Sequence, residues 1–93
     1  MKYNKKVFVI VDAYTTGRFL APYLNANGYS CIHVQSREQV IPVYFATFNR
    51  ENFVDNLIFR DNITEITRYL QFYDIKAIIP GAETGVMLAD KLN

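Results

Sequence analysis

An alternation of short apolar runs with helical patterns constrains the fold of this 93-residue chain more than any other feature. The first apolar run, Val7 to Val11, contains no polar residue and is rich in β-branched side chains. Such a run is typical of a parallel strand that is covered on both faces, because a strand with one solvated face alternates apolar and polar residues. A polar turn and a helical pattern follow directly. The chain is therefore predicted to start as a strand–helix unit.

The same pattern continues to the end of the sequence. Further strands are predicted at Ser30 to Gln35, Asn56 to Phe59 and Lys76 to Ile79. Helices are predicted at Arg18 to Asn27, after Asn62, and at Thr84 to Leu92. Alternation of this kind favours a parallel sheet with right-handed crossovers. We therefore expect one α/β domain over residues 1–93, a Rossmann-like three-layer sandwich with a four-stranded, mostly parallel sheet.

Two prolines mark places where this regular pattern should be disturbed. Pro22 removes a backbone donor from the first helix, and we expect it to bend that helix or to delay its regular part. Pro42 interrupts the apolar segment Val40 to Phe48, which we interpret as an extended loop or a short helical piece. Asn62 and Glu65 form a capping-box pattern. The helix behind them has an apolar face made of Ile63, Ile66, Leu70 and Tyr73.

The charge balance argues against a nucleic-acid partner. The chain has 10 basic and 9 acidic residues and a net charge of +1. Its one basic cluster, Lys2, Lys5 and Lys6, precedes the first strand and is explained by a solvated start of the chain. A nucleic-acid binder normally presents a basic stripe or patch, and no such pattern is present in this sequence.

Cysteine content and hydropathy indicate the compartment. The single cysteine, Cys31, has no partner for an internal disulfide, as is typical of a reducing cytosol. No apolar run approaches the roughly 20 residues needed to cross a bilayer. Val7 to Val11 is too short for the apolar region of a signal peptide, and no small-residue cleavage site follows it. We expect a cytoplasmic protein without a membrane partner.

The first candidate site is the turn from Asp12 to Arg18, between a strand and a helix. Open α/β sheets bind ligands at this position, outside the carboxyl ends of their strands. Arg18 suits a carboxylate or phosphate, and helix-start N–H groups favour an anion. In the structural alternative, Thr15 or Thr16 caps the helix, Gly17 serves the turn and Arg18 is solvated. The turn lacks the three glycines of a dinucleotide fingerprint and the lysine of a P-loop, which disfavours nicotinamide or nucleotide binding here.

The second candidate site is the turn from Pro80 to Gly85, after the last strand. Glu83 lies between Gly81 and Gly85, where its carboxylate would repel phosphate and attract an amine or a hydroxyl. The flanking glycines indicate a close backbone approach. In the structural alternative, Glu83 simply favours a helix start through the helix dipole.

Other reactive residue types do not form a catalytic set. His33 lies between Ile32 and Val34 and is interpreted as a structural histidine, and Cys31 as a small buried residue. No second histidine or cysteine has the spacing of a zinc site. Aromatic residues from 44 to 53 suit either a nucleobase platform or packing, and packing is the preferred interpretation. Gln35 and Ser36 end the second strand beside the first turn.

Three segments carry a resemblance to a known family. They read Val-Ile-Val-Asp-Ala-Tyr-Thr-Thr-Gly-Arg-Phe-Leu-Ala-Pro, Gly-Tyr-Ser-Cys-Ile-His-Val-Gln-Ser and Ile-Ile-Pro-Gly-Ala-Glu-Thr-Gly-Val-Met-Leu-Ala-Asp. In this order they resemble the N-terminal pre-ATP-grasp domain of ATP-grasp ligases, as in biotin carboxylase, carbamoyl phosphate synthetase and amino-acid ligases. The likeness covers nearly the whole chain. The residues after Pro80 and Gly81 differ from those of biotin carboxylase, which favours an amino acid or another small carboxylate as substrate.

The resemblance implies a role in a larger enzyme. Family members activate a carboxylate as an acylphosphate, which an amine or another nucleophile then attacks. ATP and magnesium would bind later domains, so this chain alone should not turn over ATP. Its part would be one wall of the substrate site, and the family also suggests a possible homodimer. The wall would comprise Asp12, Tyr14, Thr15, Thr16, Gly17, Arg18, Gly81, Glu83, Thr84 and Gly85.

Two interpretations of the chain as a whole stay open. In the first, it is a fragment of a longer ligase, because the sequence stops at a helix with no strand after it. In the second, it is a free-standing binding or regulatory module that senses a small ligand at the same edge or pairs with a partner through Val40 to Phe53. Chain length separates the two, since a ligase needs roughly two hundred further residues.

Overall fold

The computed structural model describes residues 6–93, and its central feature is a four-stranded sheet in the order β3-β2-β1-β4. The strands are β1 (Lys6–Val11), β2 (Ser30–Gln35), β3 (Asp55–Ile58) and β4 (Asp74–Pro80). All neighbouring pairs are parallel, so the predicted fold class is confirmed and the sheet is wholly rather than mostly parallel. Lys2 and Lys5 of the predicted basic cluster lie outside the described residues.

β1 occupies the middle of the sheet, as its uniformly apolar sequence predicts. It pairs with β2 on one side and with β4 on the other. Val9, Ile10 and Val11 are fully buried because both faces of the strand are covered. Val11 aligns with Val34 of β2 and with Pro80 of β4. The turns that follow β1 and β4 therefore leave the sheet at the same edge.

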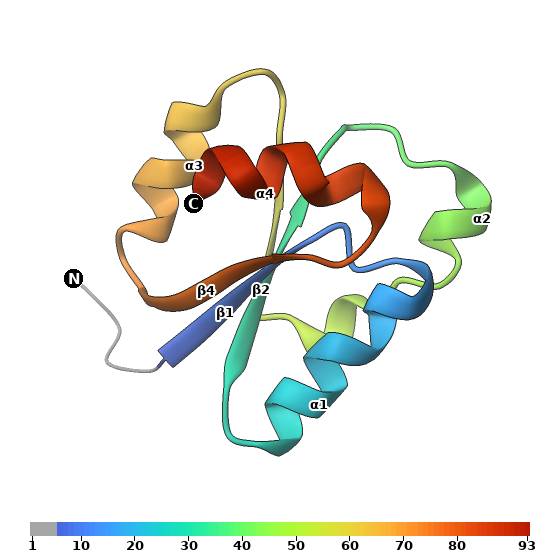
Figure 1. Ribbon diagram of the computed structural model, residues 1–93, viewed down its shortest axis with the longest axis horizontal. Helices are drawn as coiled ribbons and strands as arrows, with labels where there is room; N and C mark the ends of the chain where they lie inside the picture. The colour runs from blue at the N-terminus through green and yellow to red at the C-terminus, as the bar shows by residue number, and fades with distance from the viewer. Residues whose placement is uncertain (1–5) are drawn as a thin grey trace.

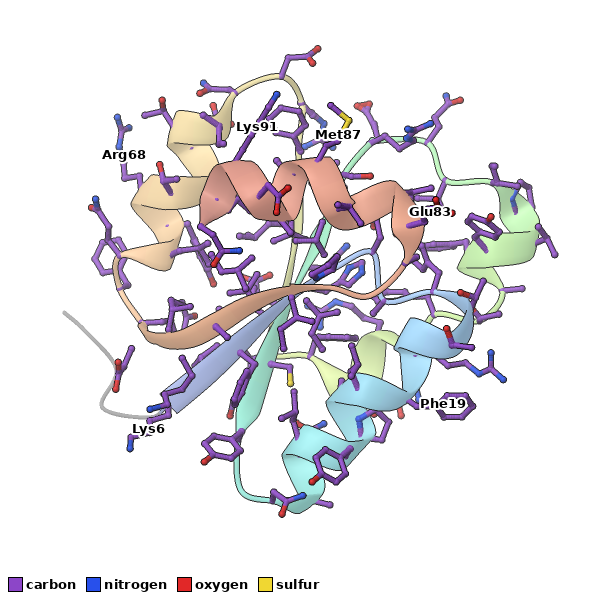
Figure 2. The ribbon with its side chains drawn as sticks, in the orientation of Figure 1. Lys6, Phe19, Arg68, Glu83, Met87 and Lys91 are labelled. Atoms are coloured by element: carbon purple, nitrogen blue, oxygen red, sulfur yellow. The ribbon has the colours of Figure 1, made fainter. Side chains whose placement is uncertain are left out.

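Helices cover both faces of this sheet (Figure 1). On one face, α3 (Ile63–Leu70) and α4 (Val86–Leu92) pack Ile66, Leu70, Leu88 and Ala89 against the sheet. On the other face, α1 (Leu20–Ala26) contributes Ala21 to a second core with Ile10, Cys31 and Phe53. The three-layer arrangement follows. Figure 2 shows that Phe19 and Met87 point away from both cores.

The helix boundaries differ from the predicted ones at two helix starts. The chain after β1 first forms a 3-10 turn, Thr15–Phe19, and α1 begins only at Leu20. Pro22 then lies in the first turn of α1, where its missing N–H costs no intrahelical bond, so the predicted delay is confirmed. The last helix is likewise preceded by a 3-10 turn, Glu83–Gly85.

The middle of the chain holds the short elements. α2 (Pro42–Phe45) is the helical piece predicted around Pro42, and a 3-10 turn at Arg50–Asn52 precedes β3. Asn62 caps α3 by accepting a hydrogen bond from the Thr64 N–H at 3.1 Å. Within residues 6–93, no helix combines the length and the apolar character needed to cross a membrane.

Candidate functional site

The two predicted turns lie against one another, with backbone touching backbone. A Cβ atom on Gly17 would lie 2.0 Å from the carbonyl oxygen of Gly81, and one on Gly81 would lie 2.7 Å from the carbonyl oxygen of Asp12. At Gly85, a Cβ would come within 2.5 Å of the Val11 carbonyl oxygen. Only glycine permits such approaches. The close contact that these glycines indicate is thus one between segments of this chain.

Asp12 fixes the second turn to the ends of two strands. Its side chain is buried and accepts hydrogen bonds from the Ser36 N–H at 2.8 Å and the Ser36 hydroxyl at 2.6 Å. The Thr84 hydroxyl donates to the same carboxylate at 2.7 Å, across 72 positions of sequence. Hydrogen bonds to a charged acceptor are among the strong ones. Asp12 therefore holds β1, the end of β2 and the turn before α4 in a fixed arrangement.

His33 supports the first turn from beneath. Its ring is fully buried, and Nε2 accepts a hydrogen bond from the Ala13 N–H at 3.0 Å. Because Nε2 accepts, the proton sits on Nδ1, which donates to Asn56 Oδ1 at 2.6 Å. Burial lowers the pKa of His33 to about 4, so the ring is neutral at neutral pH. The structural interpretation of His33 is confirmed.

Thr15 is held in a strained backbone conformation at the start of the 3-10 turn. Its φ of 54° lies in the left-handed region, which a β-branched residue rarely adopts. Its N–H donates to the Thr47 hydroxyl at 2.9 Å, and that hydroxyl donates to the Tyr44 carbonyl at 2.6 Å. Strain of this kind persists only where surrounding contacts enforce it. The first turn and α2 are therefore tied together.

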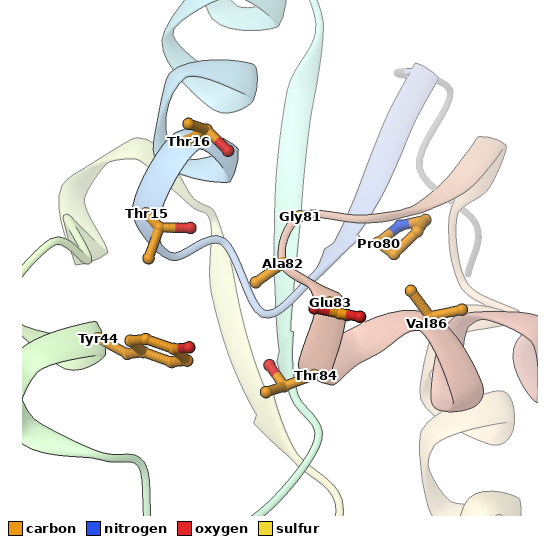
Figure 3. Close-up of a pocket in the computed structure, with 9 residues that line it drawn as sticks. All are labelled: Thr15, Thr16, Tyr44, Pro80, Gly81, Ala82, Glu83, Thr84 and Val86. Carbon is orange, nitrogen blue, oxygen red and sulfur yellow. The ribbon is translucent and has the colours of Figure 1, made fainter.

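An open cleft of about 710 Å³ lies between these elements. Figure 3 shows Thr15 and Thr16 on one side, Glu83, Thr84 and Val86 on the other, and Tyr44 reaching in from α2. Five of the predicted site residues line it: Thr15, Thr16, Gly81, Glu83 and Thr84. Within residues 6–93, the exposed Glu83 carboxylate has neither a hydrogen-bond nor an ion-pair partner.

The remaining predicted site residues stand outside the lining of this cleft. Asp12, Tyr14, Gly17 and Gly85 are buried behind it. Arg18 is turned back on its own segment: Nη1 donates to the Thr15 carbonyl at 2.9 Å, and the guanidinium lies 4.4 Å from the centre of the Phe19 ring. Arg18 therefore borders Thr15 without lining the cleft itself.

The chain is similar in sequence to a known synthase. It is 44% identical to dapdiamide A synthase of Enterobacter agglomerans. The alignment is 93 residues long and covers 97% of this chain but only 22% of that protein. The chain therefore spans about a fifth of the length of the relative that it matches. No protein-family model and no solved structure matches the chain.

Two residues that line the cleft, Tyr44 and Val86, lie outside both predicted turns, whereas Pro80 and Ala82 belong to the second turn but not to the predicted wall. The aromatic stretch was the available signal for Tyr44, yet its members separate in the structure. Phe53 is buried, and Phe48 packs on the His33 ring with their centres 4.3 Å apart. Packing is thus confirmed for these two residues, while Tyr44 faces the cleft (Figure 3).

Tyr14 adds a buried polar group behind the cleft. Its ring is almost fully buried against His33 and Phe48, and its hydroxyl has no hydrogen-bond partner within the described part of the chain. Burial raises the pKa of Tyr14, and the nearby Asp12 raises it further. Tyr14 also lines a crevice of about 20 Å³. A space of that size accommodates one water molecule beside polar groups.

The cleft has a distinct chemical character. Among the described residues, Glu83 is the one charged side chain that lines it, and threonine and tyrosine hydroxyls are the other polar side-chain groups. Among residues 6–93, no cluster of histidine, cysteine and carboxylate side chains is arranged to hold a metal ion. Cys31 is buried away from the cleft, and burial raises the pKa of its thiol to about 11. Binding and positioning, rather than nucleophilic catalysis, are what these residues suit.

Proposed function

We propose that this chain is the N-terminal, substrate-side domain of an ATP-grasp ligase that joins a carboxylate to an amine. The observation that carries the proposal is the 44% identity to dapdiamide A synthase, which extends over nearly all of this chain and a fifth of that protein. The position of the cleft supports it, because parallel α/β sheets bind ligands at the carboxyl ends of their strands. The substrate would be an amino acid or another small carboxylate.

In this proposal, the chain supplies one wall of the substrate site. Thr15, Glu83 and Thr84 would contact the substrate, since they line the cleft. Asp12 and His33 would act as positioning residues, because they hold the two turns through hydrogen bonds without lining the cleft. A wall held at these points is preorganised, which lowers the entropic cost of binding.

In this proposal, ATP and magnesium bind outside this cleft. Glu83, the one charged side chain that lines it among residues 6–93, would repel a triphosphate, and Arg18 is not among the lining residues. The turns that follow β1 and β4 are closed by their own backbone contacts, which leaves no glycine-rich cradle for phosphate. We therefore place nucleotide binding and phosphoryl transfer in other parts of the complete enzyme.

A chimera tests the proposal. The segment of dapdiamide A synthase that matches this chain is replaced by residues 1–93, and dapdiamide A formation is followed by mass spectrometry. We expect product from the chimera and none from the relative with the segment deleted. A chimera that is folded by circular dichroism but forms no product would contradict the proposed role.

A further inference from the structure

We propose that the cleft binds the protonated amine of its ligand, and that Glu83, Thr15 and Thr84 accept hydrogen bonds from that amine. The inference rests on the proposed function and deepens it, because it states which end of the substrate this wall holds. It depends on where the hydrogen atoms of the lining hydroxyls already point.

Two of the lining hydroxyls already donate hydrogen bonds to acceptors within this chain. The Thr84 hydroxyl donates to Asp12 Oδ2 at 2.7 Å, and the Thr15 hydroxyl donates to the Tyr14 carbonyl at 2.7 Å. Each hydroxyl has one hydrogen and two lone pairs, so both oxygens are left as acceptors. Only a ligand that brings its own N–H or O–H groups can bind to them.

The charge of the cleft selects the same kind of ligand. Glu83 adds two carboxylate oxygens, is exposed, and has no partner within residues 6–93. Among residues 6–93, no lysine, arginine or histidine lines the cleft. Arg18, the nearby cation in the first turn, contacts the Thr15 carbonyl and the Phe19 ring and is not among the lining residues. A ligand carboxylate would therefore meet a carboxylate, whereas an ammonium group would meet its complement.

Tyr44 completes the surroundings of an ammonium group. Its side chain enters the cleft from α2 (Figure 3), and the Tyr44 backbone is tied to the first turn because its carbonyl accepts from the Thr47 hydroxyl, which accepts from the Thr15 N–H. Tyrosine rings attract cations over their faces. An ammonium group carries three donors and no acceptor, which matches a lining of carboxylate, acceptor hydroxyls and aromatic ring.

Three small probes distinguish binding of the amine end of an amino acid from binding of its carboxylate end. L-alaninamide has an amine and no carboxylate, N-acetyl-L-alanine has a carboxylate and no free amine, and N-acetyl-L-alaninamide has neither. The 93-residue chain is titrated with each at pH 7, and backbone amide resonances are followed by NMR. We expect L-alaninamide to shift the resonances of Thr15, Glu83 and Thr84, and both acetylated probes to leave them in place.

A matched pair of variants assigns the binding to Glu83. Glu83→Gln keeps the shape and removes the charge, and we expect it to weaken L-alaninamide binding about tenfold, as loss of a hydrogen bond to a charged group implies. Glu65→Gln removes the same charge from the exposed first turn of α3 and should leave binding unchanged.

Shifts caused by N-acetyl-L-alanine alone, or by none of the probes, would overturn the amine assignment. Equal affinity in the Glu83→Gln variant would do so as well. Each of these results leaves the substrate-wall role to be judged by the chimera, so the two proposals fail separately.

Discussion

Asp12 and His33 are buried polar residues whose partners lie far away in the sequence: the Asp12 carboxylate holds the second turn through Thr84, and the His33 ring holds the first turn through the Ala13 N–H. Asp12 itself has a φ of 61°, a left-handed conformation that aspartate tolerates better than most residues. The sequence indicates that Asp12 ends a strand and that His33 is structural. It does not reveal that Thr84 and Ala13 are their partners, because those contacts form only when the sheet assembles.

His33 makes folding stability depend on pH in a defined direction. Its pKa is about 4 in the folded chain and 6.5 ordinarily, so between these values the unfolded chain binds a proton that the folded chain does not. The contribution is fully present above pH 6.5 and is lost as the pH falls toward 4. At about 1.4 kcal/mol per pH unit, the loss amounts to roughly 3 kcal/mol.

Urea unfolding across this pH range measures the effect. The His33→Gln variant has no titrating ring, so the slope of its unfolding free energy against pH should be smaller than that of the parent chain. The comparison uses slopes because the variant will also be less stable at every pH. Identical slopes would show that His33 is not the titrating group.

At the scale of elements, the contact between the turns after β1 and β4 decides whether the cleft exists. Gly17→Ala would place a methyl group 2.0 Å from the Gly81 carbonyl oxygen, and neither backbone can move without disturbing its strand. We expect a loss of about 3 kcal/mol in the free energy of unfolding, the upper range for overpacking.

Gly28→Ala is the matched control for this substitution. Gly28 has a φ of 88°, and a methyl group added there would meet no atom within 4 Å, so the cost is conformational strain alone, about 1 kcal/mol. Urea midpoints of the two variants give the difference directly. If Gly17→Ala were as stable as Gly28→Ala, the two turns would not be in backbone contact.

The elements themselves were largely predictable, and the cleft only in part. Apolar runs and helical spacing are local signals, so the four strands and the helical segments follow from them. The position of Tyr44 does not follow from local signals, because it depends on the hydrogen bond between Thr15 and Thr47, which are 32 residues apart. Arg18 shows the converse: its residue type suits an anion, yet it does not line the cleft, and its guanidinium contacts the Thr15 carbonyl and the Phe19 ring instead.

For the molecule as a whole, the parallel sheet brings segments that are far apart in the sequence together on one surface. Because every strand runs the same way, the turn after β1 and the turn after β4 meet at one edge, and α2 adds Tyr44 to the cleft that they line. The result is an open wall, in which the lining residues Glu83 and Thr16 are exposed. These residues form one side of a binding site. A ligase would have to supply the opposite wall.

That requirement leads to a prediction about the protein in its source cells. If the chain is the substrate wall of a ligase, an antibody raised against it should detect a band several times larger than 10.8 kDa on a denaturing immunoblot. The 93-residue chain, run beside the cell extract, marks the smaller size. A band at 10.8 kDa alone would instead favour the free-standing module, whose cleft must bind its ligand with Glu83, Tyr44 and the threonine hydroxyls and without a second wall.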